Sequence, residues 1–183
     1  TGTRAAIAGY DVVVVRSEDG IISPDALRAA MDDSVAAVMM TCPNTLGLFE
    51  RHLPEIVDIV HGKDALLYYD GANLNAILGK MRVGDMGFDV VHLNLHKTFA
   101  TPHGGGGPGA GAVGVKKILA PFLPGPRVER TEGGLRFTMP EQSIGAVKAF
   151  YGNFLVVVRA LAYAMTLGAD GMKLAATTAV LNA

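Results

Sequence analysis

The fold is indicated by two apolar runs, Ala65-Leu-Leu-Tyr-Tyr-Asp70 and Asp89-Val-Val-His-Leu-Asn-Leu95. Each reads as a strand that is covered on both faces. The first run ends in Asp70, and Lys97 follows the second, 27 residues after Asp70. That spacing accommodates one strand–connection–strand unit. In a parallel α/β sheet both side chains would emerge at the carboxyl edge, where ligands bind. We therefore expect a carboxylate and an amine from neighbouring strands to face one ligand.

Further strand and helix signals extend this alternation toward the amino terminus. Asp11-Val-Val-Val-Val-Arg16 and Ala36-Ala-Val-Met-Met-Thr41 also read as buried strands. A helix is expected to start at Ser23, which can cap it, with Pro24 in the first helical position. Another is expected over residues 53–61, where apolar residues recur on one helical face. The alternation predicts an α/β fold with a mainly parallel sheet and flanking helices.

The chain changes character after Lys97. Residues 101–111 contain a run of glycines that must form a loop, and residues 112–116 read as a short strand. Prolines and glycines remove any period from residues 118–142, so an irregular loop is expected there. Helical spacing returns from residue 143, which predicts helix packing beside the sheet over residues 143–183.

Composition excludes several classes of function. The 183 residues are 50% hydrophobic and carry a net charge of -1 without a block of one sign, so we expect a globular domain that does not bind nucleic acid. The only cysteine, Cys42, excludes an intramolecular disulfide and a zinc site built on several thiolates, and it favours the cytoplasm. We expect no metal.

The most apolar stretch, residues 149–168, is interrupted by Arg159 and falls short of the roughly 20 apolar residues that span a bilayer. We expect a buried helix and no membrane association.

The pairing of Asp70 with Lys97 suits one cofactor in particular. Pyridoxal phosphate (PLP) needs a lysine for its aldehyde, and its pyridine nitrogen stays protonated through an ion pair with a carboxylate. The methyl group of Ala72, two residues after Asp70, could pack flat beneath such a ring. Each residue alone has a simpler interpretation, because an aspartate at a strand end usually caps the chain and a loop lysine is usually solvated. Their combination with His96 and the glycine loop favours the cofactor site.

Several sequence motifs resemble those of a known family. Three stretches carry most of the likeness: Tyr69-Asp-Gly-Ala-Asn-Leu-Asn-Ala76, His92-Leu-Asn-Leu-His-Lys-Thr-Phe99 and Pro102-His-Gly-Gly-Gly-Gly-Pro-Gly109. Further matches are Pro43-Asn-Thr-Leu-Gly-Leu-Phe-Glu50, Ala120-Pro-Phe-Leu-Pro-Gly125 and Ser143-Ile-Gly-Ala-Val-Lys-Ala-Phe-Tyr-Gly-Asn153. They look like the P-protein of the glycine cleavage system, glycine dehydrogenase (decarboxylating), and closest to the second subunit of its two-subunit bacterial form.

The resemblance implies roles for individual residues. Lys97 would hold PLP as a Schiff base, Asp70 would pair with the pyridinium, and Ala72 would pack on the ring. Asn44 would lie near the phenolic oxygen of the cofactor. His96 would stack or hydrogen-bond near the cofactor, although a histidine beside a strand end is as often a packing residue.

The glycine loop at residues 104–107 leaves two interpretations open. No Gly-Lys-Ser or Gly-Lys-Thr follows it, so a nucleotide P-loop is rejected. It would form either a flexible wall that admits the lipoyl arm of a carrier protein or a plain mobile loop, and His103 shares this ambiguity.

The resemblance also implies a fold, a reaction and partners. The chain would be one partial large domain of the fold type I, aspartate-aminotransferase-like PLP enzymes, with the sheet core and its lysine in residues 1–117. It would decarboxylate glycine and pass the aminomethyl group to the lipoyl arm of H-protein, assembled with a partner P-protein subunit or a second copy. The family's amino-terminal phosphate-holding turn and carboxy-terminal small domain have no counterpart in this sequence, so we expect the isolated chain to be inactive. Alternatives are a cysteine desulfurase or amino-acid decarboxylase of the same fold, or a non-catalytic fragment or assembly subunit.

Overall fold

The computed structural model describes residues 2–147 and 150–183. Within them the chain forms two compact units, the first ending at Leu67 and the second beginning at Tyr68. The division falls inside the strand β4 (Leu66–Gly71).

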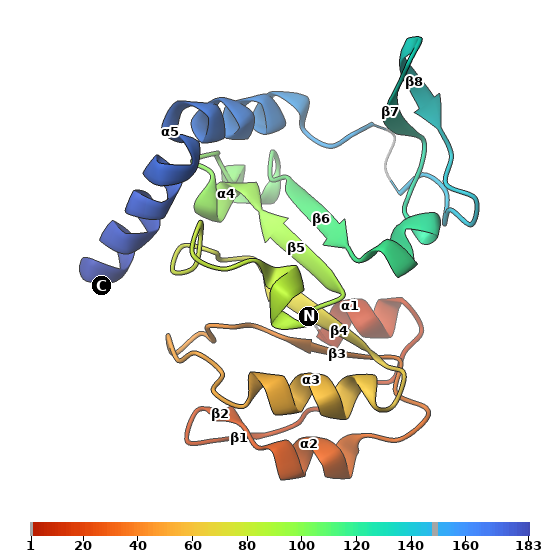
Figure 1. Cartoon of the computed structure of the whole chain (residues 1–183), viewed down its shortest axis with the longest axis vertical. Coiled ribbons are helices and arrows are strands. Elements are labelled where there is room, and N and C mark those ends of the chain that lie inside the picture. The colour runs from red at the N-terminus through yellow and green to blue at the C-terminus, as the bar shows by residue number, and fades with distance from the viewer. Residues whose placement is uncertain (1, 148–149) are drawn as a thin grey trace. The chain divides into compact units, whose positions relative to one another are not determined.

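The first unit is built of short helices and strands. Its elements, labelled in Figure 1, are α1 (Gly2–Ile7), β1 (Ser17–Glu18), β2 (Ile21–Ile22), α2 (Pro24–Ala30), β3 (Ala37–Met40) and α3 (Leu53–His61). The predicted start of α2 is confirmed, because the Ser23 hydroxyl accepts a hydrogen bond from the Ala26 N–H at 3.4 Å. Helix α3 also follows the prediction and buries Leu53, Ile56 and Val60 on one face.

One predicted strand of the first unit is wrong. Residues 11–16 form no strand, and the side chains of Val13 and Val14 are 75% and 80% exposed. A strand persists only where a neighbour satisfies its backbone groups, and within the described part of this unit no strand pairs with the segment. The chain instead forms the small antiparallel pair β1–β2. The carboxylate of the buried Glu50 anchors this pair by accepting the Ile22 N–H at 2.9 Å.

In the second unit, β5 has a neighbouring strand of the sheet on each side. Strand β4 pairs in parallel with β5 (Val90–Asn94), which pairs antiparallel with β6 (Gly111–Val115). The α/β class is confirmed, and the antiparallel β6 makes this part of the sheet mixed. Tyr69 of β4 packs edge-on against Phe88, with ring centroids 4.9 Å apart, and both side chains are buried. This contact joins β4, which carries Asp70, to the residues that lead into β5.

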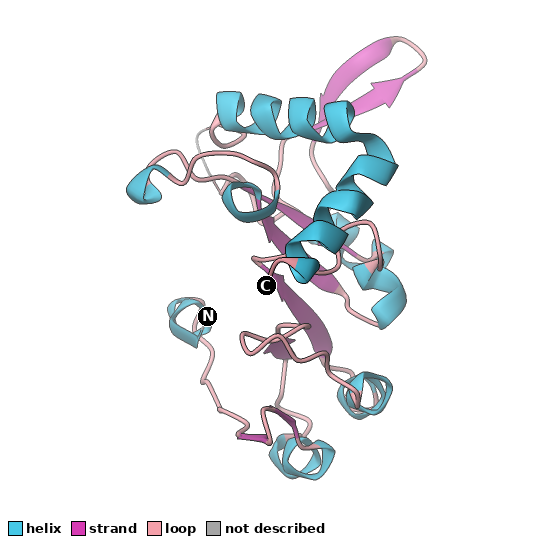
Figure 2. Cartoon of the chain, turned by 90° about the vertical axis from the view of Figure 1, so that its left-hand side faces the viewer, coloured by secondary structure: helices cyan, strands magenta, loops and turns pink. Residues whose placement is uncertain are grey.

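The helices of the second unit begin directly after β5. The short α4 (Leu95–Thr98) continues from Asn94, and the long α5 (Phe154–Leu181) packs on it through a small apolar cluster of Leu95, Val156 and Ala160. Figure 2 shows that α5 bends. Within this helix Gly168 has non-helical angles (φ 61, ψ -172). A non-glycine residue rarely adopts that backbone conformation.

The carboxy-terminal helix departs from the prediction in two ways. It begins at Phe154 rather than residue 143, and residues 148–149 of the predicted helical segment lie outside the described residues. The expected buried helix is also largely exposed, because only Val156, Ala160 and Ala176 of α5 are buried. By length and composition alone α5 could cross a membrane, but a single helix of this kind does not identify a membrane protein.

The stretch predicted to be irregular, residues 118–142, contains regular structure. A 3-10 turn, η3 (Lys117–Phe122), is followed by the antiparallel hairpin of β7 (Arg127–Thr131) and β8 (Gly134–Thr138). The prediction failed because each strand of the hairpin is short, and the few alternating apolar and polar residues on either side of Gly133 and Gly134 are too short a pattern to indicate a strand. Two further 3-10 turns complete the unit, η1 (Val83–Met86) and η2 (Gly104–Gly106).

Candidate active site

The parallel pairing of β4 with β5 brings their carboxyl ends to one edge of the sheet. In the register of the two strands Asp70 lies opposite His92, and Gly71 lies opposite Leu93. Lys97 follows on α4, which starts where β5 ends. The predicted placement of Asp70 and Lys97 at one sheet edge is therefore confirmed, although the role of each remains a prediction.

The Asp70 carboxylate is held by one of its two oxygens. Its Oδ1 accepts a hydrogen bond from the Ala72 N–H at 3.1 Å and lies 3.2 Å from Nε2 of His92. The other ring nitrogen of His92, Nδ1, lies 2.8 Å from the Tyr68 hydroxyl. Both contacts reach Oδ1, so among the described residues Oδ2 remains available to a cationic partner.

His92 was missed by the sequence analysis. It is a polar residue inside an apolar strand, and in the sequence it only interrupts the apolar pattern without indicating a functional site. The strand register could have revealed it, because aligning the carboxyl ends of two parallel strands sets His92 beside Asp70.

Lys97 presents its amine to solvent. The side chain is exposed, and no ion pair within the described residues involves its Nζ. Two other lysines form ion pairs: Lys63 pairs with Asp33 at 2.9 Å, and Lys116 pairs with Asp89 at 3.1 Å. An unpaired primary amine close to a strand end is suited to bond with an aldehyde.

His96, the residue before Lys97, is packed rather than solvated. Its ring lies edge-on to that of His103, with centroids 4.6 Å apart, and its buried Nδ1 has no hydrogen-bond partner within the described residues. Gly109 lies next to this ring, where a Cβ would be in ordinary van der Waals contact with Nδ1 at 3.5 Å. Burial first, and then the neighbouring charges of His103 and Lys97, lower the pKa of His96 below its ordinary value. Near neutral pH the ring is therefore uncharged.

Asn44 belongs to the first unit and organises a loop there. Its Oδ1 accepts the N–H groups of Leu46 at 3.0 Å and Leu48 at 3.2 Å, and its Nδ2 donates to the Gly20 carbonyl at 2.6 Å. The predicted contact of Asn44 with a cofactor remains a prediction.

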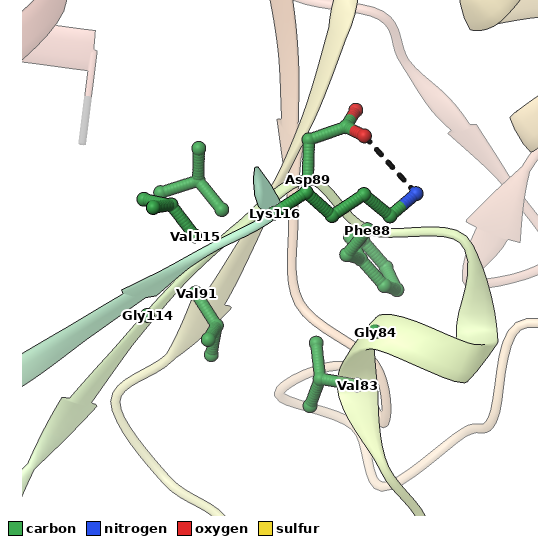
Figure 3. A pocket seen from close by; sticks show the side chains of 9 residues that line it. Val83, Gly84, Phe88, Asp89, Val91, Gly114, Val115 and Lys116 are labelled. Carbon is green, nitrogen blue, oxygen red and sulfur yellow. Dashed lines mark ion pairs between the residues drawn. The ribbon is translucent and has the colours of Figure 1, made fainter. Parts of the chain in front are cut away.

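A cavity of about 200 Å³ opens at the other end of β5. Val83, Phe88 and Val91 line it, and the Lys116 ammonium reaches the Asp89 carboxylate beside it (Figure 3). Asp89 directly precedes β5 whereas Lys97 follows it, so this cavity is separate from the candidate site. No group of three or more potential metal-binding side chains gathers within the part of the chain that the structure describes.

Comparison with known proteins gives the family. Residues 3–128 match the aminotransferase class-V family. The chain belongs to this family. Membership implies PLP as the cofactor and confirms the predicted fold class.

Curated relatives refine this result. The chain is 59% identical over 182 residues to the probable glycine dehydrogenase (decarboxylating) subunit 2 of Caldanaerobacter subterraneus, and 54% identical over 179 residues to that of Thermotoga maritima. Each match covers 98% of this chain but only 37% or 38% of the relative. The resemblance seen in the motifs is thus confirmed, and the chain spans little more than a third of the length of these relatives.

Solved structures support the fold alone. A sphingosine-1-phosphate lyase from Burkholderia pseudomallei superposes with a TM-score of 0.64 at 19% identity, over 96% of this chain and 40% of that one. A cysteine desulfurase from Escherichia coli superposes with a TM-score of 0.59 at 18% identity, over 92% and 42%.

The residues at the sheet edge fit the implied cofactor. A shielded carboxylate with one oxygen already fixed matches a protonated ring nitrogen, and an unpaired lysine amine matches an aldehyde. Gly71 and Gly111 keep the strands close at this edge, because a Cβ on either would come within 2.7 Å of a backbone oxygen.

Proposed function

We propose that this chain carries the lysine-bearing core of a glycine dehydrogenase (decarboxylating), which removes CO2 from glycine and transfers the aminomethyl group to the lipoyl arm of H-protein. The observation that carries the proposal is the parallel β4–β5 pair, which sets Asp70 and Lys97 at one sheet edge. The 54–60% identity to proteins named as subunit 2 of this enzyme supports the choice of reaction.

Each site residue has a defined task in this proposal. Lys97 would hold PLP covalently, Asp70 would pair through Oδ2 with its ring nitrogen, and Ala72 would lie against the ring. When bound, PLP supplies an electron sink for the bond to the glycine carboxylate. Asp70 keeps a negative charge beside that sink, in a site whose shielding strengthens the interaction.

Two residues have supporting tasks. The uncharged His96 ring would form a wall beside Lys97, because burial keeps a proton off it. Asn44 would approach the phenolic oxygen of the cofactor with an amide hydrogen, since its Nδ2 carries two hydrogens and the Gly20 carbonyl uses one.

The proposal includes partners and a compartment. The reaction needs a lipoylated H-protein as acceptor and, in the two-subunit form, a second P-protein subunit. A second copy of the chain is the alternative assembly. Cytoplasmic location is proposed from the relatives' bacterial sources and the single buried Cys42.

The test is the exchange of labelled bicarbonate with the carboxylate of glycine, catalysed by the full-length protein with its partner P-protein subunit and lipoylated H-protein. Wild type is expected to exchange, Lys97→Ala to lose exchange, and Lys80→Ala, at another exposed lysine, to match wild type. Sulfide release from cysteine without glycine exchange would show instead a desulfurase of the same fold. Neither reaction in a PLP-loaded, folded protein would favour a non-catalytic subunit.

A further inference from the structure

Three polar side chains line one face of the β4–β5 pair. Tyr68 and Asp70 alternate with the buried Tyr69 along β4, so both point to the same side of the sheet. His92 of β5 lies opposite Asp70 in the register and touches both of them. The rings of Tyr68 and His92 have centroids 5.7 Å apart and planes tilted by 43°.

The contacts of His92 form a chain that ends on Asp70. Its Nδ1 lies 2.8 Å from the Tyr68 hydroxyl, and its Nε2 lies 3.2 Å from Oδ1 of Asp70. A carboxylate only accepts hydrogen bonds, so Nε2 must carry a proton for the contact to be favourable. A hydroxyl hydrogen directed at Nδ1 places the imidazole proton on Nε2. Tyr68 therefore favours the form of His92 that can donate to Asp70.

The same contacts orient the carboxylate. The Ala72 N–H also donates to Oδ1, at 3.1 Å, so the residue that follows β4 and His92 of β5 both contact one oxygen. Rotating the carboxylate would break both contacts. The side chains of His92 and Asp70 are each only 15% exposed, so water competes weakly for them.

We propose that His92, aligned by Tyr68, is a positioning residue that fixes Oδ1 of Asp70 and so directs Oδ2 at the ring nitrogen of bound PLP. The inference rests on the proposed function, because it acts through the pairing of Asp70 with that nitrogen. His92 does not touch the cofactor in this arrangement. Its effect is limited to properties that depend on the ring nitrogen.

The test compares the binding of PLP with that of its 1-deaza analogue, in which carbon replaces the ring nitrogen. Dissociation constants are measured on the full-length apoprotein by equilibrium titration, so no turnover is needed. Wild type is expected to bind PLP more tightly than the analogue. This preference isolates the ring-nitrogen interaction from the phosphate and aldehyde contacts, which both ligands share.

Two substitutions form a matched pair at His92. His92→Gln retains an N–H donor at the reach of Nε2, whereas the shorter amide of His92→Asn falls short of Asp70. We expect His92→Asn to reduce the preference for PLP about tenfold, the loss of one polar contact to a charged group, and His92→Gln to stay within about threefold of wild type. Tyr68→Phe, which keeps the ring and removes the hydroxyl, is expected to fall between them.

Control variants separate the possible failures. Asp70→Ala, which leaves no group to bind the ring nitrogen, should remove the preference, and adding His92→Asn to it should change nothing further, since the two act in series. A preference that survives in Asp70→Ala would overturn the proposed role of Asp70. Loss of the preference in Asp70→Ala with full retention in a folded His92→Asn would overturn the role of His92 alone. If His92→Asn does not fold, as judged by circular dichroism of the apoprotein, a wild-type preference in Tyr68→Phe overturns the relay.

Discussion

Gly71 and His92 lie so close across the β4–β5 ladder that a Cβ on Gly71 would come 2.5 Å from the His92 carbonyl oxygen. The same Cβ would meet Leu93 and Tyr69 at 2.9 Å. Gly71 directly follows Asp70, so the narrow spacing exists at the point where the carboxylate leaves the strand. The glycine therefore sets the distance between the strands that carry Asp70 and His92.

Gly71→Ala is expected to destabilise the protein by about 1–3 kcal/mol, the usual cost of forcing a methylene into a packed site. Gly84→Ala is the matched control, because a Cβ there meets nothing within 4 Å. It is expected to leave the free energy of unfolding within about 1 kcal/mol of wild type. Urea denaturation of both variants measures the difference. Equal stability of the two variants would show that β4 and β5 separate without cost.

Lys97 is expected to be the residue that PLP labels. Borohydride reduction of the PLP-treated full-length protein, followed by peptide mapping, should find the pyridoxyl group on Lys97. The Lys116 amine is held by Asp89 and by the Gly87 carbonyl at 3.2 Å, and the Lys63 amine is held by Asp33, so both should remain unlabelled. Label on Lys63, Lys80 or Lys116 in place of Lys97 would refute the assignment.

Asp70→Asn is expected to impair turnover far more than cofactor binding. An amide can still hydrogen-bond the ring nitrogen, but it cannot keep that nitrogen charged. Loss of about 3 kcal/mol of transition-state stabilisation corresponds to a decrease of about a hundredfold in the rate of glycine–bicarbonate exchange. Asp170→Asn, on the exposed surface of α5, is the control and should exchange at the wild-type rate. A near-normal rate in Asp70→Asn would remove Asp70 from the mechanism.

The sheet edge could be predicted from the sequence because its signals are local and agree. The runs before Asp70 and before Lys97 are mostly apolar, and buried parallel strands are the usual structure of such runs. The polar residues that end them had to emerge at one edge once the strands were parallel. The helix caps at Ser23 and the apolar face of α3 are equally local signals, and both predictions were confirmed.

The remaining features depend on partners that a single sequence does not reveal. Residues 11–16 have strand composition, yet a strand forms only where another strand accepts its hydrogen bonds. The β7–β8 hairpin arises from the pairing of two short segments, neither of which is regular alone. The contact of His92 with Asp70 depends on strand register, which apolar composition does not encode. The described part of the helical segment starts late because residues 150–153 contain Gly152, whose φ of 87° is not helical.

His96 is expected to make the stability of the protein depend on pH. The folded state lowers the pKa of His96 below its ordinary value of 6.5, mainly through burial. The unfolded chain therefore binds a proton at a higher pH than the folded protein does. It follows that stability falls as the pH decreases below about 6.5.

His96→Phe retains a ring and removes the titrating group. The free energy of unfolding, measured from about pH 7 to about pH 5 by urea denaturation, should decrease less steeply in this variant than in wild type. His103→Gln removes one of the charges that lower the pKa of His96 and should reduce the slope partly. Identical slopes in wild type and His96→Phe would mean that His96 does not titrate in this range.

The isolated 183-residue chain is expected not to release CO2 from glycine, because a site built on Asp70 and Lys97 holds only one side of the cofactor. PLP is usually anchored by several charge-assisted hydrogen bonds to its phosphate, and none of the residues proposed for the cofactor site supplies them. The chain covers 37–38% of the relatives' length and leaves apolar residues such as Leu155, Met165 and Leu174 of α5 exposed, which favours self-association. The measurement is release of labelled CO2 by the purified chain with saturating PLP and lipoylated H-protein, next to a full-length protein as positive control. Cofactor binding with no release is the expected outcome. Release at the rate of the full-length protein would show that residues 1–183 complete the site themselves.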